Sequence, residues 1–281
     1  MLPVRETSSD LSTRFRAFRR THPYREVNAS GTTWRYLTGG KVGPAVLLLP
    51  GELRSPEPFF ALMESLESDG RVVAPAYPAV PTVTDLVVGA VATMDAEGIS
   101  RFAVLGTGFG GCVAQCLVRR YPQKVDRLVL ANTGLSRSSV PAEAQQLAAA
   151  GMGLLPEQLV RRITRRMWLQ QISARTPDAG FWMELLQELA GKVHKDDIAS
   201  QFAELADFGA CHSLQRADLA AWPGRVLIVE SEGDAAYGPK AQAQLRATYP
   251  RAQVHRFPAT AGAPLFDRPD EFISVVQQFL A

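Results

Sequence analysis

The chain has 281 residues, of which 46% are hydrophobic and 21% are charged, and its formal net charge is +2. These values are typical of a globular protein with a buried core, and they argue against a partner such as nucleic acid that is held by a strongly basic surface. No apolar run is long enough to span a bilayer and no segment has the pattern of a signal peptide. We therefore expect a cytoplasmic protein that is not an integral membrane protein, and the sequence leaves a homodimer open.

The N-terminal part begins with a basic segment and continues with alternating strands and helices. FRAFRR places Phe15 and Phe18 on one face of a helix, among arginines, and we expect a docking helix with solvated arginines rather than a membrane-surface helix. We expect strands over 33–38, 45–49, 72–76, 102–105 and 127–131. We expect helices over 59–66 and 85–94. This alternation predicts an α/β protein with a mostly parallel central sheet flanked by helices.

The pattern changes to helices without strands from about Gly134 to Trp222. Helical spacing of apolar residues covers 141–150, 156–171, 181–193 and 197–206. The strand–helix alternation then resumes over 225–230, 239–249, 253–257 and 269–280. We therefore expect a single domain of residues 1–281, with a core formed by 21–134 and 223–281 and a helical cap insertion over 135–222.

Residues 102–117, FAVLGTGFGGCVAQCL, have the strand–turn–helix pattern of the nucleophile elbow, G-x-S-x-G. Gly106 and Gly110 occupy the two positions where the tight turn requires small residues. The nucleophile's own position is Gly108, which has no side chain. The sequence therefore predicts an elbow without a nucleophile.

The order of segments resembles the α/β-hydrolase fold along nearly the whole chain. The resemblance is carried by LLLPGELRSPEPFF, RVVAPAYP, FAVLGTGFGGCVAQ, RLVLANTG and VLIVESEGD. Within that fold, FRRTHP, LLLPGE and VVAPAYP are similar to segments of the maspardin-like branch, whose members are described as binding other proteins. That branch keeps a serine at the elbow, so Gly108 departs even from it.

The resemblance implies a serine, a histidine and a carboxylate that act together, because the histidine takes the proton of the serine and the carboxylate orients the histidine. Asp234 follows the strand VLIVE, where the carboxylate is expected. The position of the histidine is Gly262, and no histidine occurs from Arg256 to the end of the chain. His212, in the cap, is the better candidate for a displaced base than the other histidines. We therefore expect a degenerate triad and no triad hydrolysis.

The loop and helix around the elbow are expected to keep a binding site. The Phe109 and Gly110 amides lie at a helix N-terminus, which favours an anion or a carbonyl oxygen, and the loop after LLLP should face them. The candidate ligand-binding residues are Gly51, Leu53, Gly108, Phe109, Gly110 and Trp168. The candidate acids or bases are Asp234, Glu52 and His212. Two simpler interpretations stay open: Gly108 only relieves backbone strain, and Trp168 only packs in the cap.

We consider two functions. The first is a non-hydrolytic protein, or pseudo-hydrolase, that binds a small ligand or a protein partner. The second is an enzyme that uses the vestigial pocket for cyclisation, lyase, isomerase or proton-transfer chemistry on a small metabolite.

Two other motifs carry weaker interpretations. Gly106, Gly108 and Gly111 also match G-x-G-x-x-G of dinucleotide-binding proteins, but Asn132 stands where the ribose-binding acid is expected, so we expect no cofactor. RRITRRMW, residues 161–168, is interpreted as an amphipathic cap helix with solvated arginines, in preference to a surface for an acidic partner. The cysteines lack metal-ligand spacing, and we expect no metal site.

Overall fold

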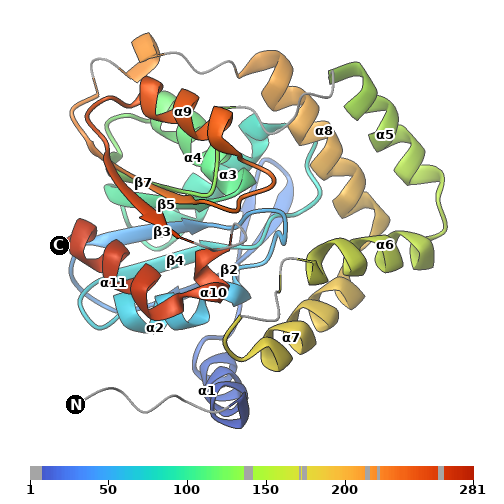
Figure 1. Ribbon diagram of the computed structural model, residues 1–281, viewed down its shortest axis with the longest axis horizontal. Helices are drawn as coiled ribbons and strands as arrows, with labels where there is room; N and C mark the ends of the chain where they lie inside the picture. The colour runs from blue at the N-terminus through green and yellow to red at the C-terminus, as the bar shows by residue number, and fades with distance from the viewer. Residues whose placement is uncertain are drawn as a thin grey trace.

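The computed structural model describes residues 8–135, 142–170, 172, 176–212, 216–219, 222–258 and 263–281. One eight-stranded sheet runs through it in the order β1-β2-β4-β3-β5-β6-β7-β8 (Figure 1). The strands are β1 (Arg25–Ala29), β2 (Thr32–Gly39), β3 (Ala45–Leu49), β4 (Arg71–Pro75), β5 (Phe102–Thr107), β6 (Val125–Ala131), β7 (Arg225–Ser231) and β8 (Gln253–Phe257). β1 and β2 pair antiparallel with each other and β2 with β4, and every other pairing is parallel. The predicted mostly parallel α/β sheet is confirmed.

Helices cover both faces of the sheet. α3 (Val83–Ala96), α4 (Phe109–Arg120) and α9 (Pro239–Thr248) pack on one face, and α2 (Phe60–Leu66) and α11 (Pro269–Leu280) pack on the other (Figure 1). All five residues of β3, AVLLL, are buried, and successive ones belong to opposite faces of the sheet. A continuously apolar strand is the pattern expected where helices remove both faces from water.

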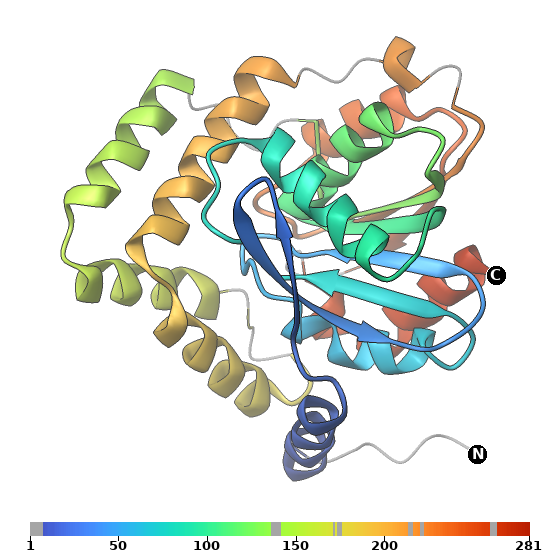
Figure 2. The same ribbon diagram turned by 180° about the vertical axis from the view of Figure 1, so that it is seen from behind.

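Four helices follow one another between β6 and β7, as the change of pattern predicts. They are α5 (Ala142–Leu154), α6 (Glu157–Leu169), α7 (Ala179–Lys192) and α8 (Lys195–Cys211). Both views show them together beyond one end of the sheet, with α5 beside α8 and α6 beside α7 (Figures 1 and 2). The expected helices over 181–193 and 197–206 are displaced by two residues at their starts, and the second extends five residues further.

The N-terminal helix α1 (Ser8–Thr21) docks on both the sheet layer and α7. The Phe15 ring packs edge-on against Phe60 of α2 at 5.1 Å and Phe181 of α7 at 5.5 Å between centroids, and Phe18 is also buried. The buried face of α1 therefore carries Phe15 and Phe18, as predicted. Two arginines differ from the expectation: Arg14 is partly buried beside the Glu64 carboxylate of α2, and Arg19 is partly buried between the carboxylates of Glu57 and Glu188. Arg19 therefore ties α7 to the core.

Four elements of the described structure were not predicted from the sequence. β1 is an edge strand whose residues are mostly exposed, so it lacks a strong apolar alternation. The other three are single turns, too short to show a helical period: 3-10 helices over Glu57–Phe59 and Arg216–Leu219, and α10 over Pro264–Asp267. No helix in the described part of the chain combines the length and apolarity that a bilayer crossing requires.

Candidate functional site

The turn between β5 and α4 has the strained geometry of a nucleophile elbow. Gly108 has φ +52° and ψ −124°, which a residue with a side chain rarely adopts. A Cβ at Gly106 would lie 2.3 Å from the Gly110 carbonyl oxygen, and one at Gly110 would lie 2.3 Å from the Leu49 carbonyl oxygen. The two flanking glycines are therefore required by close backbone packing, and the predicted elbow is confirmed as a backbone structure.

The carboxylate of Glu52 lies directly beside the elbow. The Phe109 amide at the start of α4 donates a hydrogen bond of 3.2 Å to Glu52 Oε1. A Cβ built on Gly108 would lie 2.6 Å from Glu52 Oε2, so the carboxylate fills space that a residue-108 side chain would need. The Phe109 amide, which the sequence predicts as a donor to an anion, therefore already donates to an acidic side chain of the protein.

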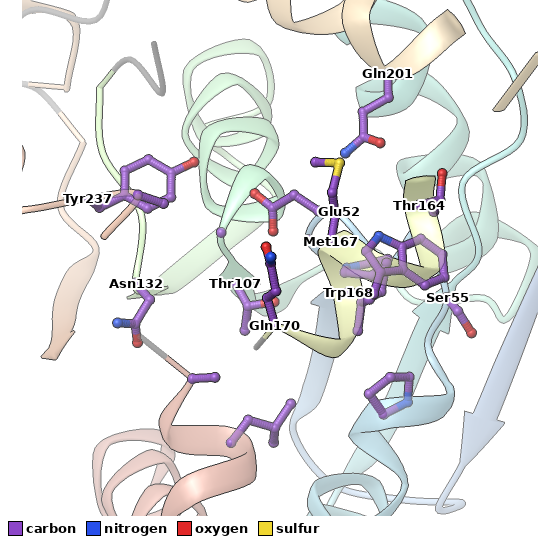
Figure 3. A pocket seen from close by; sticks show the side chains of 18 of the residues that line it. Glu52, Ser55, Thr107, Asn132, Thr164, Met167, Trp168, Gln170, Gln201 and Tyr237 are labelled. Carbon is purple, nitrogen blue, oxygen red and sulfur yellow. The ribbon is translucent and has the colours of Figure 1, made fainter. Parts of the chain in front are cut away.

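A cavity of about 670 Å³ opens above the elbow. Residues that follow the carboxyl ends of β3, β5, β6 and β7 form its floor, which is where open parallel sheets bind ligands. Side chains of α6 and α8, including Thr164, Trp168 and Gln201, line the opposite side (Figure 3). A cavity of this volume is in the range that holds small organic molecules.

The structure brings most of the predicted site residues to this cavity. The predicted residues that line it are Gly51, Glu52, Leu53, Gly108, Trp168 and Asp234. Phe109 and Gly110 are buried at the start of α4 beneath it, and Phe109 contributes its backbone amide to Glu52. The sequence analysis did not identify the polar lining residues Thr164 and Gln201. The sequence indicated only that they lie on helices of the insertion between β6 and β7.

Asp234 stabilises the turn that follows β7. Its Oδ1 accepts hydrogen bonds from the Ala236 and Tyr237 amides at 2.9 and 2.8 Å, and its Oδ2 accepts one from Asn132 Nδ2 at 3.0 Å. Asn132 has φ +48° and follows β6, so the contact joins two neighbouring strand ends. These bonds account for a carboxylate at this position without any catalytic role.

Asn132 also contains a buried acceptor. The residue is 9% exposed and lines the cavity, but its Oδ1 atom is itself buried and has no hydrogen-bond partner in the described structure. A buried acceptor without a partner costs free energy.

His212 is not brought to the cavity. It follows α8, its Nε2 lies 3.3 Å from Asp207 Oδ2, and its ring stacks on Phe208. His22, His194 and His255 likewise lie beside the carboxylates of Glu67, Glu157 and Glu271. Gly262, the expected position of the family histidine, lies outside the described residues. The described lining of the cavity therefore contains no histidine, and the displaced base suggested for His212 has no support in its position.

A buried ion pair joins the loop after β3 to α8, and no sequence signal predicted it. Arg54 donates two hydrogen bonds to Glu204, at 2.7 and 3.0 Å, and the side chains are 6% and 0% exposed. Burial raises the pKa of Glu204 to about 7, although the Arg54 charge opposes the rise. The pair fixes α8, which carries Gln201, over the loop that carries Glu52.

Among the described residues no three His, Cys, Asp or Glu side chains are grouped so that they could share a metal ion. The charged side chains that line the described cavity are Glu52 and Asp234, with no lysine or arginine. The site can therefore offer carboxylates, amides, hydroxyls and an apolar wall to a ligand.

Solved structures with the same fold are numerous. A hydrolase from Pseudomonas aeruginosa PA01 aligns with a TM-score of 0.77 at 22% identity, over 92% of this chain and 98% of that one. The enol-lactonase of Burkholderia xenovorans LB400 aligns with a TM-score of 0.75 at 17% identity, over 91% and 99%. At these identities the likeness shows the fold alone.

Comparison of the sequence with known proteins identifies one similar curated protein and one matching family. The sn-1-specific diacylglycerol lipase ABHD11 of Mus musculus is 23% identical over 192 residues, which span 66% of this chain and 60% of the mouse protein. The sequence pattern of the alpha/beta hydrolase family matches residues 46–275, which include β3, the elbow, the helical insertion and most of α11. The chain therefore belongs to the alpha/beta hydrolase family.

Proposed function

We propose that the protein binds a small, mostly apolar molecule in the cavity above the elbow and does not hydrolyse esters by a serine–histidine mechanism. In this proposal residues 135–222 act as a cap over a core formed by 21–134 and 223–281. The observation that carries the proposal is the pairing of Gly108 with Glu52, which leaves a formed cavity but puts a carboxylate beside the nucleophile's position.

Acyl transfer through a serine needs groups that the described lining of this cavity does not contain. An attacking hydroxyl requires a base, and the negative oxygen that develops must be met by hydrogen-bond donors. Here the Phe109 amide is bonded to Glu52, whose negative charge would oppose a second negative oxygen. The lipase activity named for the mouse relative and the hydrolase names of the structural neighbours are therefore not carried over to this chain.

Two measurements test the absence of hydrolysis. We would record the intact mass after incubation with a serine-directed fluorophosphonate, and assay turnover of short-chain chromogenic esters. We expect no covalent adduct, and we expect ester hydrolysis no faster than in buffer without the protein. A stoichiometric adduct together with turnover would show that another nucleophile serves the site, and would overturn the proposal.

Ligand binding is tested separately by a thermal-shift screen of small organic compounds with apolar bodies and different polar head groups. We expect a concentration-dependent rise in the unfolding temperature with some of them, because a ligand that binds only the folded state stabilises it. A cavity that accepts none of them would contradict the proposal.

A proton-transfer enzyme is the second candidate, and the position of Glu52 favours it. The carboxylate lies in the cavity where the family holds its reactive side chain, so it could remove a proton from a bound metabolite. Turnover that disappears in Glu52→Gln, with ligand binding retained, would support this candidate. Unchanged turnover in that variant would remove it.

Recruitment of a protein partner rests on the likeness to the maspardin-like branch and stays a prediction. Exposed apolar side chains on α5 and α6, Leu147, Leu154 and Leu159, offer a surface for it. A pull-down with wild type and a Leu147→Ser/Leu159→Ser variant tests the role of this surface. The cytoplasmic location and a homodimer are likewise predictions.

A further inference from the structure

We propose that the cavity binds an uncharged molecule and holds its carbonyl group on the side of α6 and α8, through the indole N–H of Trp168 and the amide of Gln201. The inference rests on the proposed function, because it names the chemical class of the ligand and the direction of its polar group.

The first support is a set of polar side chains that no described part of the protein engages. Thr164 and Trp168 of α6 and Gln201 of α8 line the cavity, and they are 4%, 4% and 9% exposed. None of the three side chains forms a hydrogen bond within the described part of the chain. Their polar atoms are not among the fully buried atoms without a partner, so they stay open to the cavity. Nearly buried polar groups of this kind are available to a ligand.

These three side chains form one wall, which we call the α6–α8 wall. Thr164 and Trp168 are four residues apart on α6, so they lie on the same face of that helix. α6 packs against α8, from which Gln201 extends toward the cavity (Figure 3). Three residues after Gln201, Glu204 is anchored by its buried ion pair with Arg54. The wall is therefore held in place before a ligand binds, which lowers the entropic cost of binding.

The hydrogen-bonding capacity of the α6–α8 wall fits an acceptor on the ligand. The Trp168 indole nitrogen can only donate, and the Gln201 amide offers two N–H donors and one oxygen acceptor. A carbonyl oxygen has two lone pairs, so it can accept a hydrogen bond from each side chain. An ammonium group has donors only, and it cannot pair with the indole N–H.

The charges in the cavity disfavour a charged head group of either sign. The described lining contains the carboxylates of Glu52 and Asp234 and no lysine or arginine, so a ligand carboxylate would meet charges of its own sign. Both carboxylates already have partners in the protein. Asp234 accepts three hydrogen bonds, and Glu52 accepts one from the Phe109 amide and has a further interaction. A ligand ammonium would therefore lose its water without gaining an unengaged carboxylate, which is costly.

The elbow side of the cavity is less suited to a carbonyl group. The Phe109 amide donates to Glu52, whose negative charge repels a partly negative carbonyl oxygen. Thr107 lines the cavity there with a single hydroxyl. The carbonyl group of the ligand therefore points away from the elbow and toward the α6–α8 wall.

The test compares three compounds that share a phenylethyl body and differ in the head group: benzylacetone, hydrocinnamate and phenylpropylamine. Dissociation constants are measured by isothermal titration calorimetry on the full chain at neutral pH. We expect the ketone, benzylacetone, to bind most tightly. The anion and the cation should bind at least about tenfold more weakly, because a charged head group must give up its water.

Two variants locate the carbonyl group. Trp168→Phe keeps an aromatic ring and removes the indole N–H, and Gln201→Met keeps the length of the side chain and removes the amide. Each should weaken the binding of benzylacetone about fivefold, which corresponds to one neutral hydrogen bond. The matched controls are Trp222→Phe, whose indole donates to the Val125 carbonyl outside this cavity, and Gln244→Met, an exposed position on α9. Both controls should bind benzylacetone as wild type does.

Infrared spectroscopy of bound benzylacetone gives a readout that a merely structural role would not move. Hydrogen bonds lower the stretching frequency of a ketone carbonyl, whose band is separate from that of the peptide groups. In wild type the band should lie below its position in an apolar solvent. In Trp168→Phe and Gln201→Met it should shift back toward that position.

The outcomes separate this inference from the proposed function. If either charged compound binds as tightly as benzylacetone, the preference for an uncharged head group is wrong, whereas the cavity still binds small molecules. If both variants keep the wild-type affinity and carbonyl frequency, the α6–α8 wall does not hold the carbonyl group and the inference is overturned. If none of the three compounds binds at millimolar concentration, the inference is overturned as well, and the wider thermal-shift screen decides the proposed function by itself. Should Trp168→Phe fail to fold, Gln201→Met and the wild-type infrared band decide the assignment.

Discussion

The Glu52 carboxylate occupies the space beside Gly108 that a side chain at position 108 would enter. The Cβ that any other residue would place at position 108 lies 2.6 Å from Glu52 Oε2, closer than real side chains approach. The glycine leaves the room that the carboxylate occupies, and the backbone at φ +52° also favours glycine. A serine at this position would therefore have to move the Glu52 carboxylate aside.

We predict that Gly108→Ser destabilises the protein and confers no ester hydrolysis. The positive φ costs about 1–3 kcal/mol for a residue with a side chain, and displacement of Glu52 adds to it. Urea unfolding measures the loss, and a chromogenic ester measures activity. Gly98→Ser provides the matched control, because Gly98 has φ +67° with nothing within 4 Å of its built Cβ.

The same change tests the coupling with Glu52. The contact is made by the side chains at positions 108 and 52 together. Gly108→Ser should therefore lower the free energy of unfolding by about 1 kcal/mol less in a Glu52→Ala background than in wild type, which is in the range of coupling energies between contacting residues. Equal costs in the two backgrounds would show that backbone strain, and not Glu52, accounts for the glycine.

We predict that Asp234→Asn lowers the free energy of unfolding by about 1–3 kcal/mol, because an amide cannot accept all the hydrogen bonds that the carboxylate receives. Glu232→Gln, an exposed position in the same loop, is the control for a lost charge. An Asp234→Asn variant with wild-type stability would show that these hydrogen bonds do not stabilise the turn after β7.

The sequence was sufficient for seven of the eight described strands and for the elbow, because local residue patterns indicate both. The apolar run AVLLL indicates a strand buried on both faces, and the structure buries all five residues. The glycines at 106 and 110 indicate a tight turn, and the structure leaves no room for a Cβ at either position. The edge strand β1 lacks such a pattern, since water covers much of it.

The site was predictable only in part, because its polar contacts join segments far apart in the chain. Nothing near Arg54 indicates Glu204, 150 residues later. The position of Glu52 was expected in the loop facing the elbow, but its bond to the Phe109 amide depends on the packing of that loop. His212 was placed over the site by its membership of the cap, whereas helix α8 directs it to Asp207.

We predict that Glu204 makes the stability depend on pH. Burial raises the pKa of Glu204 from its ordinary 4.5 to about 7, so between these values the folded state binds more protons than the unfolded state. The contribution of Glu204 is therefore largest below pH 4.5 and is lost as the pH rises through 7, by about 3 kcal/mol in total. Arg54 opposes this loss by stabilising the ionised carboxylate.

The measurement is urea unfolding of wild type and Glu204→Gln at several pH values between 5 and 8. The variant leaves Arg54 without its ionic partner, so its absolute stability will differ from that of wild type. The informative quantity is the difference in free energy of unfolding, wild type minus variant, which should shrink as the pH rises. Glu184→Gln should follow the wild-type profile, and a difference that grows with pH would show that Glu204 stays ionised throughout.

We predict that Gly89→Ala destabilises the core, whereas Gly209→Ala does not. A Cβ on Gly89 of α3 would lie 1.8 Å from the buried Trp34 ring, so the helix or the ring must move, at a cost of about 1–3 kcal/mol. Gly209 lies in α8 with nothing within 4 Å of its built Cβ, so alanine there should be neutral or stabilising by up to about 1 kcal/mol. The two variants make the same chemical change in a helix, so opposite signs in urea unfolding would isolate the contact with Trp34. Equal effects would contradict the described packing of α3 against Trp34, because that contact is the reason for the expected loss at Gly89.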